Sequence, residues 1–200
     1  MPIYFGVNLR FTKYGFKMTR QNYAIIDNKS SNKDWCKKHF EKCLLNYDLN
    51  IKYFASLDKE EFNKELNKFL FKHKGFEQIY DLNEYKNISG YYMLVLDEYC
   101  QVYIGTAQDI KIRILNHWSK QKQFDRLIFG TVENSILAID SFRAYDTTRI
   151  YAYPTTNTFN EEDKFINSIS HKFLLNRTVG GKLENGLLEA IMNRKVRKLI

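Results

Sequence analysis

The stretch from Gly90 to Trp118, GYYMLVLDEYCQVYIGTAQDIKIRILNHW, decides the fold that we expect. Two short apolar runs flank a polar turn, which predicts a β-hairpin, and the residues that follow have the apolar spacing of a helix. Each predicted strand carries a Tyr beside a Gly, in Gly90-Tyr91-Tyr92 and in Tyr103-Ile104-Gly105. The helix carries Arg113 and His117 one turn apart. A hairpin and one helix therefore gather two tyrosines, an arginine and a histidine.

Periodicity and turn residues predict further elements on both sides of this stretch. With 200 residues, of which 44% are hydrophobic and 16% aromatic, the chain can build one domain or two small ones. The expected strands cover residues 3–9, 22–27, 125–130 and 147–154, and the expected helices cover residues 30–47, 57–73, 133–145, 160–176 and 183–200. We divide the chain into an N-terminal α+β unit over 1–85, a module over 86–177 and a basic C-terminal helix over 178–200.

The net charge of +8 indicates an anionic partner, such as nucleic acid, an acidic membrane or an acidic protein. A basic surface also serves solubility alone, so the charge does not choose among these. No segment approaches the roughly 20 apolar residues of a membrane span. The first residues have no signal-peptide core followed by a small-residue cleavage site. We therefore expect no membrane partner and a cytoplasmic location.

The three cysteines fit that compartment. Cys36 and Cys43 are separated by roughly 10 Å along one predicted helix, which is too far for a disulfide. Cys100 has no CxxC partner. We interpret all three as small apolar fillers in a reducing environment.

One carboxylate stands out on the helix expected at 160–176. Glu162 projects near the middle of an apolar stripe that includes Phe165 and Ile166. A carboxylate there is costly unless it is paired, capping or bound to a metal. Because Glu162 lies in the first turn, it can also be a charge that favours the helix N-terminus. By themselves, the pattern at Arg113 and His117 also fits a solvated helix face, and the two strand tyrosines also fit simple packing.

Together these parts resemble the GIY-YIG nuclease family. The two tripeptides at residues 90–92 and 103–105 match its signature, and Arg113 and His117 follow at suitable spacing. Glu162 and Asn176 fill the places of a later metal-binding Glu and a final Asn. The resemblance covers roughly residues 89–177. The chain departs from the pattern at Tyr91, where Ile or Val is usual, in a longer segment over 124–145, and in residues 1–85, which have no counterpart.

The resemblance implies a fold of the α/β class in the broad sense (α+β). The module is a small antiparallel three-stranded sheet flanked by helices, and the N-terminal α+β unit is an extension of it. The implied activity is that of a metal-dependent endonuclease that hydrolyses phosphodiester bonds in nucleic acid, DNA rather than RNA. The implied metal is Mg²⁺ or Mn²⁺, held by Glu162 with waters and a substrate phosphate. Glu161 is the adjacent alternative, and the apolar stripe favours Glu162.

The resemblance also implies roles for the other site residues. Arg113 would neutralise the phosphoryl oxygens through forked hydrogen bonds. Tyr92 would orient or deprotonate the attacking water, which requires nearby cations to lower its phenol pKa from about 10. His117 would relay or supply a proton, Tyr103 would bind the phosphate or support Tyr92, and Asn176 would brace the site.

Two other interpretations remain open at this stage. The chain could be a nucleic-acid-binding module with the same fold and no turnover, or a basic partner-binding protein whose match is accidental. The complete set of site residues favours the nuclease, because a non-catalytic relative would be free to lose Arg113 or Glu162. The protein could act as a homodimer, and the first 85 residues are expected to position the nucleic acid or a second subunit.

Overall fold

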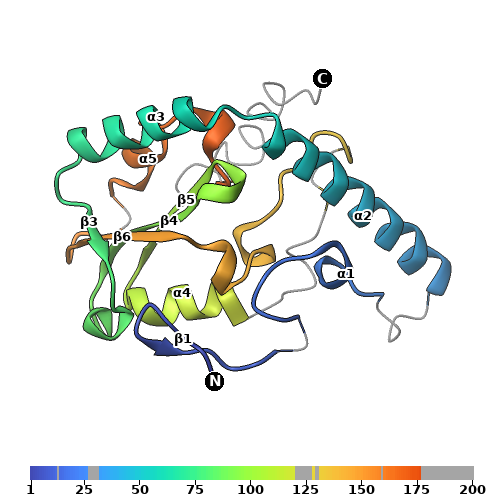
Figure 1. The fold of residues 1–200 in the computed structure, drawn as a ribbon, viewed down its shortest axis with the longest axis horizontal. Coiled ribbons are helices and arrows are strands. Elements are labelled where there is room, and N and C mark those ends of the chain that lie inside the picture. The colour runs from blue at the N-terminus through green and yellow to red at the C-terminus, as the bar shows by residue number, and fades with distance from the viewer. Residues whose placement is uncertain (13, 27–31, 120–127, 129–130, 159, 177–200) are drawn as a thin grey trace.

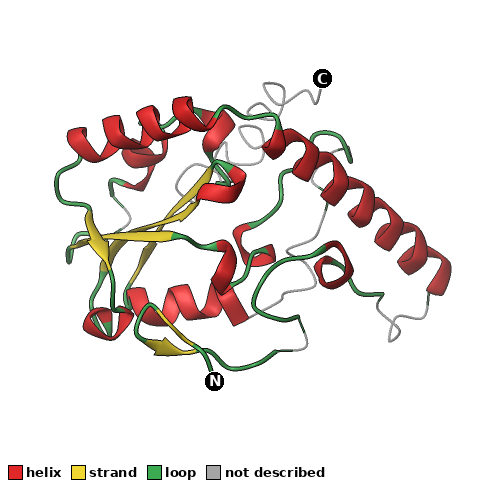
Figure 2. Ribbon diagram, viewed as in Figure 1, coloured by secondary structure: helices red, strands yellow, loops and turns green. Residues whose placement is uncertain are grey.

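The computed structural model describes residues 1–12, 14–26, 32–119, 128, 131–158 and 160–176 of the 200. Within these residues the chain has a mixed α+β fold, in which helices cover both faces of a central sheet (Figures 1 and 2). The strands are β1 (Ile3–Tyr4), β2 (Val7–Asn8), β3 (Glu77–Ile79), β4 (Gly90–Leu96), β5 (Gln101–Ala107) and β6 (Arg149–Pro154). The α-helices are α1 (Arg20–Tyr23), α2 (Lys33–Ala55), α3 (Lys59–Lys72), α4 (Ile110–Ser119) and α5 (Glu162–Ile166). Short 3₁₀ turns are η1 (Leu82–Tyr85), η2 (Asp97–Tyr99), η4 (Ile139–Ser141), η5 (Ala144–Asp146) and η6 (His171–Phe173).

The central sheet is antiparallel, with the strand order β3-β6-β4-β5. Strands β4 and β5 pair from Gly90–Ala107 to Leu96–Gln101, which confirms the expected hairpin. Strand β6 lies on the other side of β4. The sheet has four strands, not the expected three, because β3 pairs with β6. This strand is only three residues long and lies in the segment 1–85, so periodicity did not reveal it.

Strand β4 lies between two hydrophobic cores, and all seven of its residues are buried. Successive side chains of a strand point to opposite faces, so Tyr92 and Leu94 pack on the side of α4. Tyr91 and Met93 pack on the side of α3 and α5. Figure 1 shows α3 and α5 above the sheet and α4 below it.

Helices α2 and α3 are each capped by the side chain of the residue that precedes them. The side chain of Asn32 accepts a hydrogen bond from the Trp35 N–H at 2.9 Å, and that of Asp58 from the Glu61 N–H at 2.7 Å. Helix α2 continues beyond the expected end at residue 47, to Ala55. Helix α3 buries Phe62, Leu66 and Phe69 against the sheet, so residues 1–85 share a hydrophobic core with the module that follows.

Two expected strands near the N-terminus are wrong. Residues 3–9 do not form one strand, because Phe5 and Gly6 have positive φ angles of 46° and 72° and turn the chain between β1 and β2. The expected strand at 22–27 begins instead with helix α1. Its Thr19 side chain accepts from the Asn22 N–H, and the Asn22 side chain accepts from the Thr19 N–H. These local bonds outweigh the strand propensity of the residues that follow.

Two expected helices are also different. Residues 133–145 contain 3₁₀ turns, with η5 stabilised by the Asp146 carboxylate, which accepts from the backbone N–H groups of Arg143 and Met18. The helix expected at 160–176 is reduced to α5 and η6, and Glu161 rather than Asn160 precedes it. The chain leaves the helix to run beside β5, where the Leu175 N–H donates to the Val102 carbonyl at 2.8 Å.

The remaining observations concern the apolar stripe, the cysteines, the helix lengths and the segments that lie outside the described residues. The apolar residues expected on one stripe, Phe165, Ile166, Ile169 and Phe173, are all buried. The three cysteines are buried and form no disulfide among the described residues. No helix among the described residues is long and apolar enough to cross a membrane. The expected strand at 125–130 falls almost wholly, and the helix at 183–200 wholly, outside the described residues.

The shared core predicts that a substitution in α3 destabilises the whole sheet. We expect Phe69→Ala to lower the free energy of unfolding by about 3–5 kcal/mol, because Phe69 is 1% exposed and packs in the core between α3 and the sheet. Phe71→Ala on the same helix is the matched control, since Phe71 is 78% exposed and should change stability by less than about 0.5 kcal/mol. Urea denaturation of both variants measures the difference. A loss of stability in Phe69→Ala as small as that in Phe71→Ala would contradict the role of α3 in this core.

Candidate active site

Each of the two hairpin glycines occupies a position where a side chain would clash, but the clash is with a different part of the structure. At Gly105 a Cβ atom would lie 2.5 Å from the Tyr92 hydroxyl oxygen, so only glycine leaves room for the Tyr92 ring. At Gly90 φ is +154°, and a Cβ atom would lie 2.3 Å from the carbonyl oxygen of Tyr153 on β6. The glycines therefore allow close approach of a ring in one strand and of a neighbouring backbone in the other.

The register of the hairpin brings the two tyrosines to one face. Tyr92 lies opposite Gly105 and Leu94 opposite Tyr103, and residues directly opposite in an antiparallel pair point the same way. The rings of Tyr92 and Tyr103 are consequently neighbours, with centroids 6.2 Å apart.

Helix α4 brings a histidine and an arginine against these tyrosines. Its apolar residues Ile110 and Ile114 are fully buried on the sheet. His117 is 1% exposed, and its Nε2 lies 2.7 Å from the Tyr92 hydroxyl. Arg113, one turn earlier, is part-exposed, and its charge acts on the hydroxyls of both Tyr92 and Tyr103.

Glu162 approaches the same group from the other side of the sheet. Its helix α5 packs with Tyr91, and the Glu162 carboxylate lies within electrostatic range of Arg113, Tyr92 and Tyr103. Burial and the neighbouring Asp163 charge raise the pKa of Glu162, and the Arg113 charge opposes them.

The adjacent Glu161 has a different environment. Its carboxylate accepts a hydrogen bond from Lys164 at 2.9 Å, within the same helix. Its backbone N–H donates to the Tyr91 hydroxyl at 3.0 Å, and that hydroxyl donates to the Asn157 carbonyl at 2.9 Å. Tyr91 therefore holds the start of the helix that carries Glu162.

Asn176 acts on the backbone of β5. Its Oδ1 accepts from the Ile104 N–H at 3.0 Å, and its Nδ2 donates to the Ile104 carbonyl at 2.6 Å. The amide thus replaces a neighbouring strand at the outer edge of β5. Since Ile104 lies between Tyr103 and Gly105, Asn176 braces the strand rather than reaching the cluster itself.

Asp140 is a site residue that the sequence did not indicate. Its Oδ1 lies 2.5 Å from Nδ1 of His117, and it belongs to the 3₁₀ turn η4. The segment was expected to be a helix, and a lone Asp on it carried no signal of its own. Only the packing of η4 against α4 brings the two side chains together.

The electrostatics of the tyrosines differ from the expectation. Burial raises the pKa of Tyr92 well above its usual value of 10.0, and the Arg113 charge opposes this without reversing it. Burial likewise raises the pKa of Tyr103. The chain's own charges therefore do not lower the Tyr92 pKa, because one guanidinium does not replace the water lost by an enclosed phenol. Both phenols are protonated near neutral pH.

The cluster has an enclosed part and an accessible part. Tyr92 and His117 are enclosed, whereas Tyr103, Arg113 and Glu162 are part-exposed. The described residues contain no group of three or more His, Cys, Asp or Glu placed to hold a metal ion.

The carboxylates beside the cluster nevertheless suit one kind of ion. Glu162 offers oxygen donors, and Oδ1 of the adjacent Asp163 is buried without a hydrogen-bond partner in the described part of the chain. Few protein oxygens and several waters are the usual surroundings of Mg²⁺. This donor set fits Mg²⁺ or Mn²⁺ better than a metal that needs nitrogen or sulfur ligands.

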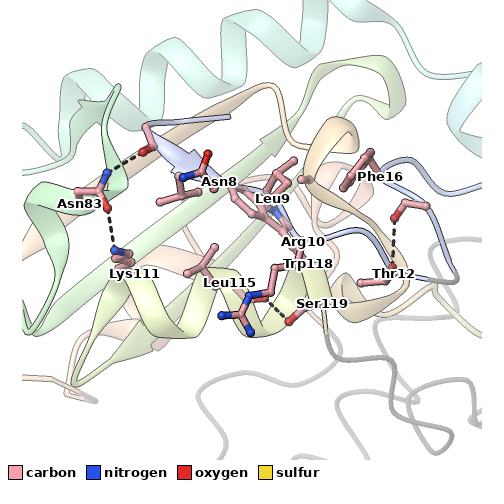
Figure 3. Close-up of a pocket in the computed structure, with 14 residues that line it drawn as sticks. Asn8, Leu9, Arg10, Thr12, Phe16, Asn83, Lys111, Leu115, Trp118 and Ser119 are labelled. Carbon is pink, nitrogen blue, oxygen red and sulfur yellow. Dashed lines mark hydrogen bonds between the residues drawn. The ribbon is translucent and has the colours of Figure 1, made fainter. Parts of the chain in front are cut away.

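A cavity of about 550 Å³ lies on the opposite edge of α4 (Figure 3). The N-terminal segment forms one wall with Asn8, Leu9 and Arg10, and α4 forms the other with Lys111 and Trp118. None of the tyrosines, Arg113, His117 or Glu162 lines it. We place the candidate active site at the cluster, because the buried titratable groups converge there.

Comparison with family models, with curated proteins and with solved structures gives no match for this chain.

The close approach at Gly105 predicts a specific defect. In Gly105→Ala the added methyl group would collide with the Tyr92 hydroxyl, so Tyr92 must move and its bond to His117 must lengthen or break. We expect the free energy of unfolding to fall by about 1–3 kcal/mol. Thr106→Ala, one residue along β5 and opposite Tyr91, is the control that leaves Tyr92 in place. An unchanged denaturation midpoint in Gly105→Ala would contradict the packing at this position.

Proposed function

We propose that this chain is a metal-dependent endonuclease of the GIY-YIG type, which hydrolyses phosphodiester bonds in nucleic acid. The observation that carries the proposal is the convergence of Tyr92, Tyr103, Arg113, His117 and Glu162 from β4, β5, α4 and α5. These residues come from four elements and span 70 positions of the chain, so local sequence alone does not explain their meeting. The combination of a guanidinium, a carboxylate and proton-transferring groups is what phosphodiester hydrolysis requires.

Glu162 would hold a divalent cation, Mg²⁺ or Mn²⁺, with Asp163 adding negative charge beside it. When bound, the cation would supply charge neutralisation for the phosphate and lower the pKa of nearby water. Glu161 is less suitable, since its carboxylate is engaged by Lys164.

Arg113 would bind the phosphoryl oxygens. In the free protein its guanidinium lies within electrostatic range of the hydroxyls of Tyr92 and Tyr103 and is part-exposed. A substrate phosphate is a stronger acceptor than a phenol, because charge-assisted hydrogen bonds are roughly twice as strong as neutral ones. We therefore expect the guanidinium to turn towards the phosphate, which would open the Tyr92 hydroxyl to water.

The two tyrosines would then have different roles. Tyr103 is part-exposed and would hydrogen-bond the phosphate, whereas the enclosed Tyr92 would accept a proton from the attacking water. Tyr92 is protonated beforehand, so it can accept that proton only if it passes its own to His117, 2.7 Å away. Asn176 would keep β5, and with it Tyr103, in place.

The second candidate function is nucleic-acid binding without cleavage. The enclosure of Tyr92, which is 0% exposed, favours it, since a proton acceptor has to meet its water. In either case the partner is nucleic acid, and we favour DNA because of the resemblance and the net charge of +8. Homodimer formation and a positioning role for residues 1–85 belong to the same proposal.

Cleavage assays decide between these two functions. Purified protein is incubated with circular duplex DNA and with circular single-stranded DNA, in Mg²⁺ or in EDTA. Linear or nicked products that appear only with Mg²⁺ are expected. Binding in a gel-shift assay without cleavage of either substrate would favour the binding module.

The carboxylates provide the first mutational test. We expect Glu162→Ala to reduce cleavage by at least about 10³-fold, because the cation and its charge neutralisation are lost. DNA binding and the thermal midpoint should be nearly unchanged, since Glu162 is part-exposed. Glu161→Ala is the matched control and should retain activity. If Glu161→Ala abolishes cleavage and Glu162→Ala does not, the metal ligand is misassigned.

The arginine provides the second test. Arg113→Lys keeps the positive charge but loses the forked donor geometry, so we expect the turnover rate to fall by about 10²–10³-fold. Lys111→Ala removes a charge from the same helix on the edge away from the tyrosines and should preserve turnover. Near-normal turnover in Arg113→Lys would indicate that Arg113 acts only as a distant charge.

A further inference from the structure

Three polar side chains form a continuous hydrogen-bonded line behind the accessible part of the site. Oδ1 of Asp140 lies 2.5 Å from Nδ1 of His117, and Nε2 of His117 lies 2.7 Å from the Tyr92 hydroxyl. The side chains of His117 and Asp140 are only 2% and 17% exposed. Both ring nitrogens of the histidine are therefore occupied by defined partners rather than by bulk water.

The surroundings of Asp140 favour its ionised form. Its carboxylate lies within electrostatic range of two guanidinium groups, those of Arg113 and Arg143. Arg143 is buried, and its Nη1 donates to the Asp140 backbone carbonyl at 3.1 Å. An ionised carboxylate only accepts hydrogen bonds, so the proton between Asp140 and His117 must reside on Nδ1.

The protonation of Nδ1 fixes the direction of the second hydrogen bond. In a neutral ring with its proton on Nδ1, Nε2 carries only a lone pair, so it can only accept. The Tyr92 O–H is the donor, 2.7 Å from Nε2. This direction requires a neutral ring whose proton is on Nδ1, which is the tautomer that Asp140 selects.

From this geometry we infer that Asp140 is a positioning residue, which holds His117 in the Nδ1–H tautomer so that Nε2 accepts the Tyr92 proton. The inference rests on the proposed function for its consequence in the reaction. There, the proton of the attacking water passes to the Tyr92 oxygen as the Tyr92 proton passes to His117. The hydroxide oxygen forms the new bond to phosphorus, the bond to the leaving oxygen breaks, and that oxygen takes a proton from solvent. The imidazolium is stabilised by Asp140 and later releases its proton to solvent.

The tautomer can be measured without any substrate. In ¹⁵N-labelled protein, the shifts and proton couplings of the ring nitrogens identify which nitrogen is protonated. The chain has four histidines, so the His117 signals are assigned by their loss in His117→Gln. We expect Nδ1 protonated and Nε2 unprotonated at neutral pH. A ring protonated on Nε2, alone or on both nitrogens, would overturn the inference.

Asp140→Asn tests the cause of that tautomer. The amide can donate to Nδ1, which would move the ring proton to Nε2 and remove the acceptor for Tyr92. We expect the ¹⁵N signature to change in this way and cleavage to fall by about 10²–10⁴-fold. Asp140→Glu, which keeps a carboxylate, should retain the Nδ1–H signature. Asp48→Asn, a matched change on the exposed partner of Arg20, should alter neither readout.

The two readouts separate this inference from the proposed function. An Nδ1–H ring that Asp140→Asn converts, in a protein that cleaves no DNA, would support the positioning role and refute the nuclease. An unchanged His117 signature in a folded Asp140→Asn protein would refute the positioning role, whatever the cleavage assay shows. The thermal midpoint of each variant identifies a folding failure, and Asp140→Glu then provides the test.

Discussion

Tyr91 and Tyr92 are neighbours on the buried strand β4 and point to opposite faces of the sheet. The hydroxyl of Tyr92 contacts α4 and that of Tyr91 contacts the start of α5, and these two helices supply Arg113, His117 and Glu162. The Tyr92 hydroxyl hydrogen-bonds His117 on α4 and lies within electrostatic range of Arg113 on the same helix. The Tyr91 hydroxyl meets the Glu161 N–H and the Asn157 carbonyl at the start of α5. A register shift of one residue in β4 would turn Tyr92 towards α5 and Tyr91 towards α4, and the hydrogen bonds of both hydroxyls would be lost. The pairing of β4 with strands on both sides, and its burial in both cores, prevents such a shift.

Burial of so many polar groups is tolerated because they satisfy one another. A buried donor or acceptor without a partner costs about 1–3 kcal/mol. At Tyr92 and His117 each hydroxyl or ring nitrogen has a partner of the right kind. The arrangement has a further effect, because the enclosed groups cannot exchange partners with water. The orientation of the rings is therefore set by the fold before any ligand arrives, which is how preorganised sites reduce the cost of reaction.

Sequence reasoning succeeded where a signal was local and repeated. The hairpin, α2, α3 and α4 all followed from short-range apolar periodicity. It failed where tertiary contacts decide the outcome. Strand β3 is too short to show alternation and exists because β6 offers it an edge. Asp140 lies 23 residues from His117 on a turn that no local pattern marks. The direction of the Tyr92 pKa shift was also out of reach, because it depends on how completely the ring is enclosed rather than on which residues are near in sequence.

The pairing of Asn176 with Ile104 places a constraint on how the chain can acquire its final form. These residues are separated by 72 positions, and the two hydrogen bonds between them cover the outer edge of β5. An exposed strand edge is a template for pairing with another chain. During synthesis the hairpin can form well before residue 176 has left the ribosome, so β5 passes through a period with a bare edge. The segment that ends at Asn176 therefore covers the β5 edge late in synthesis, and from then on other chains cannot pair with it.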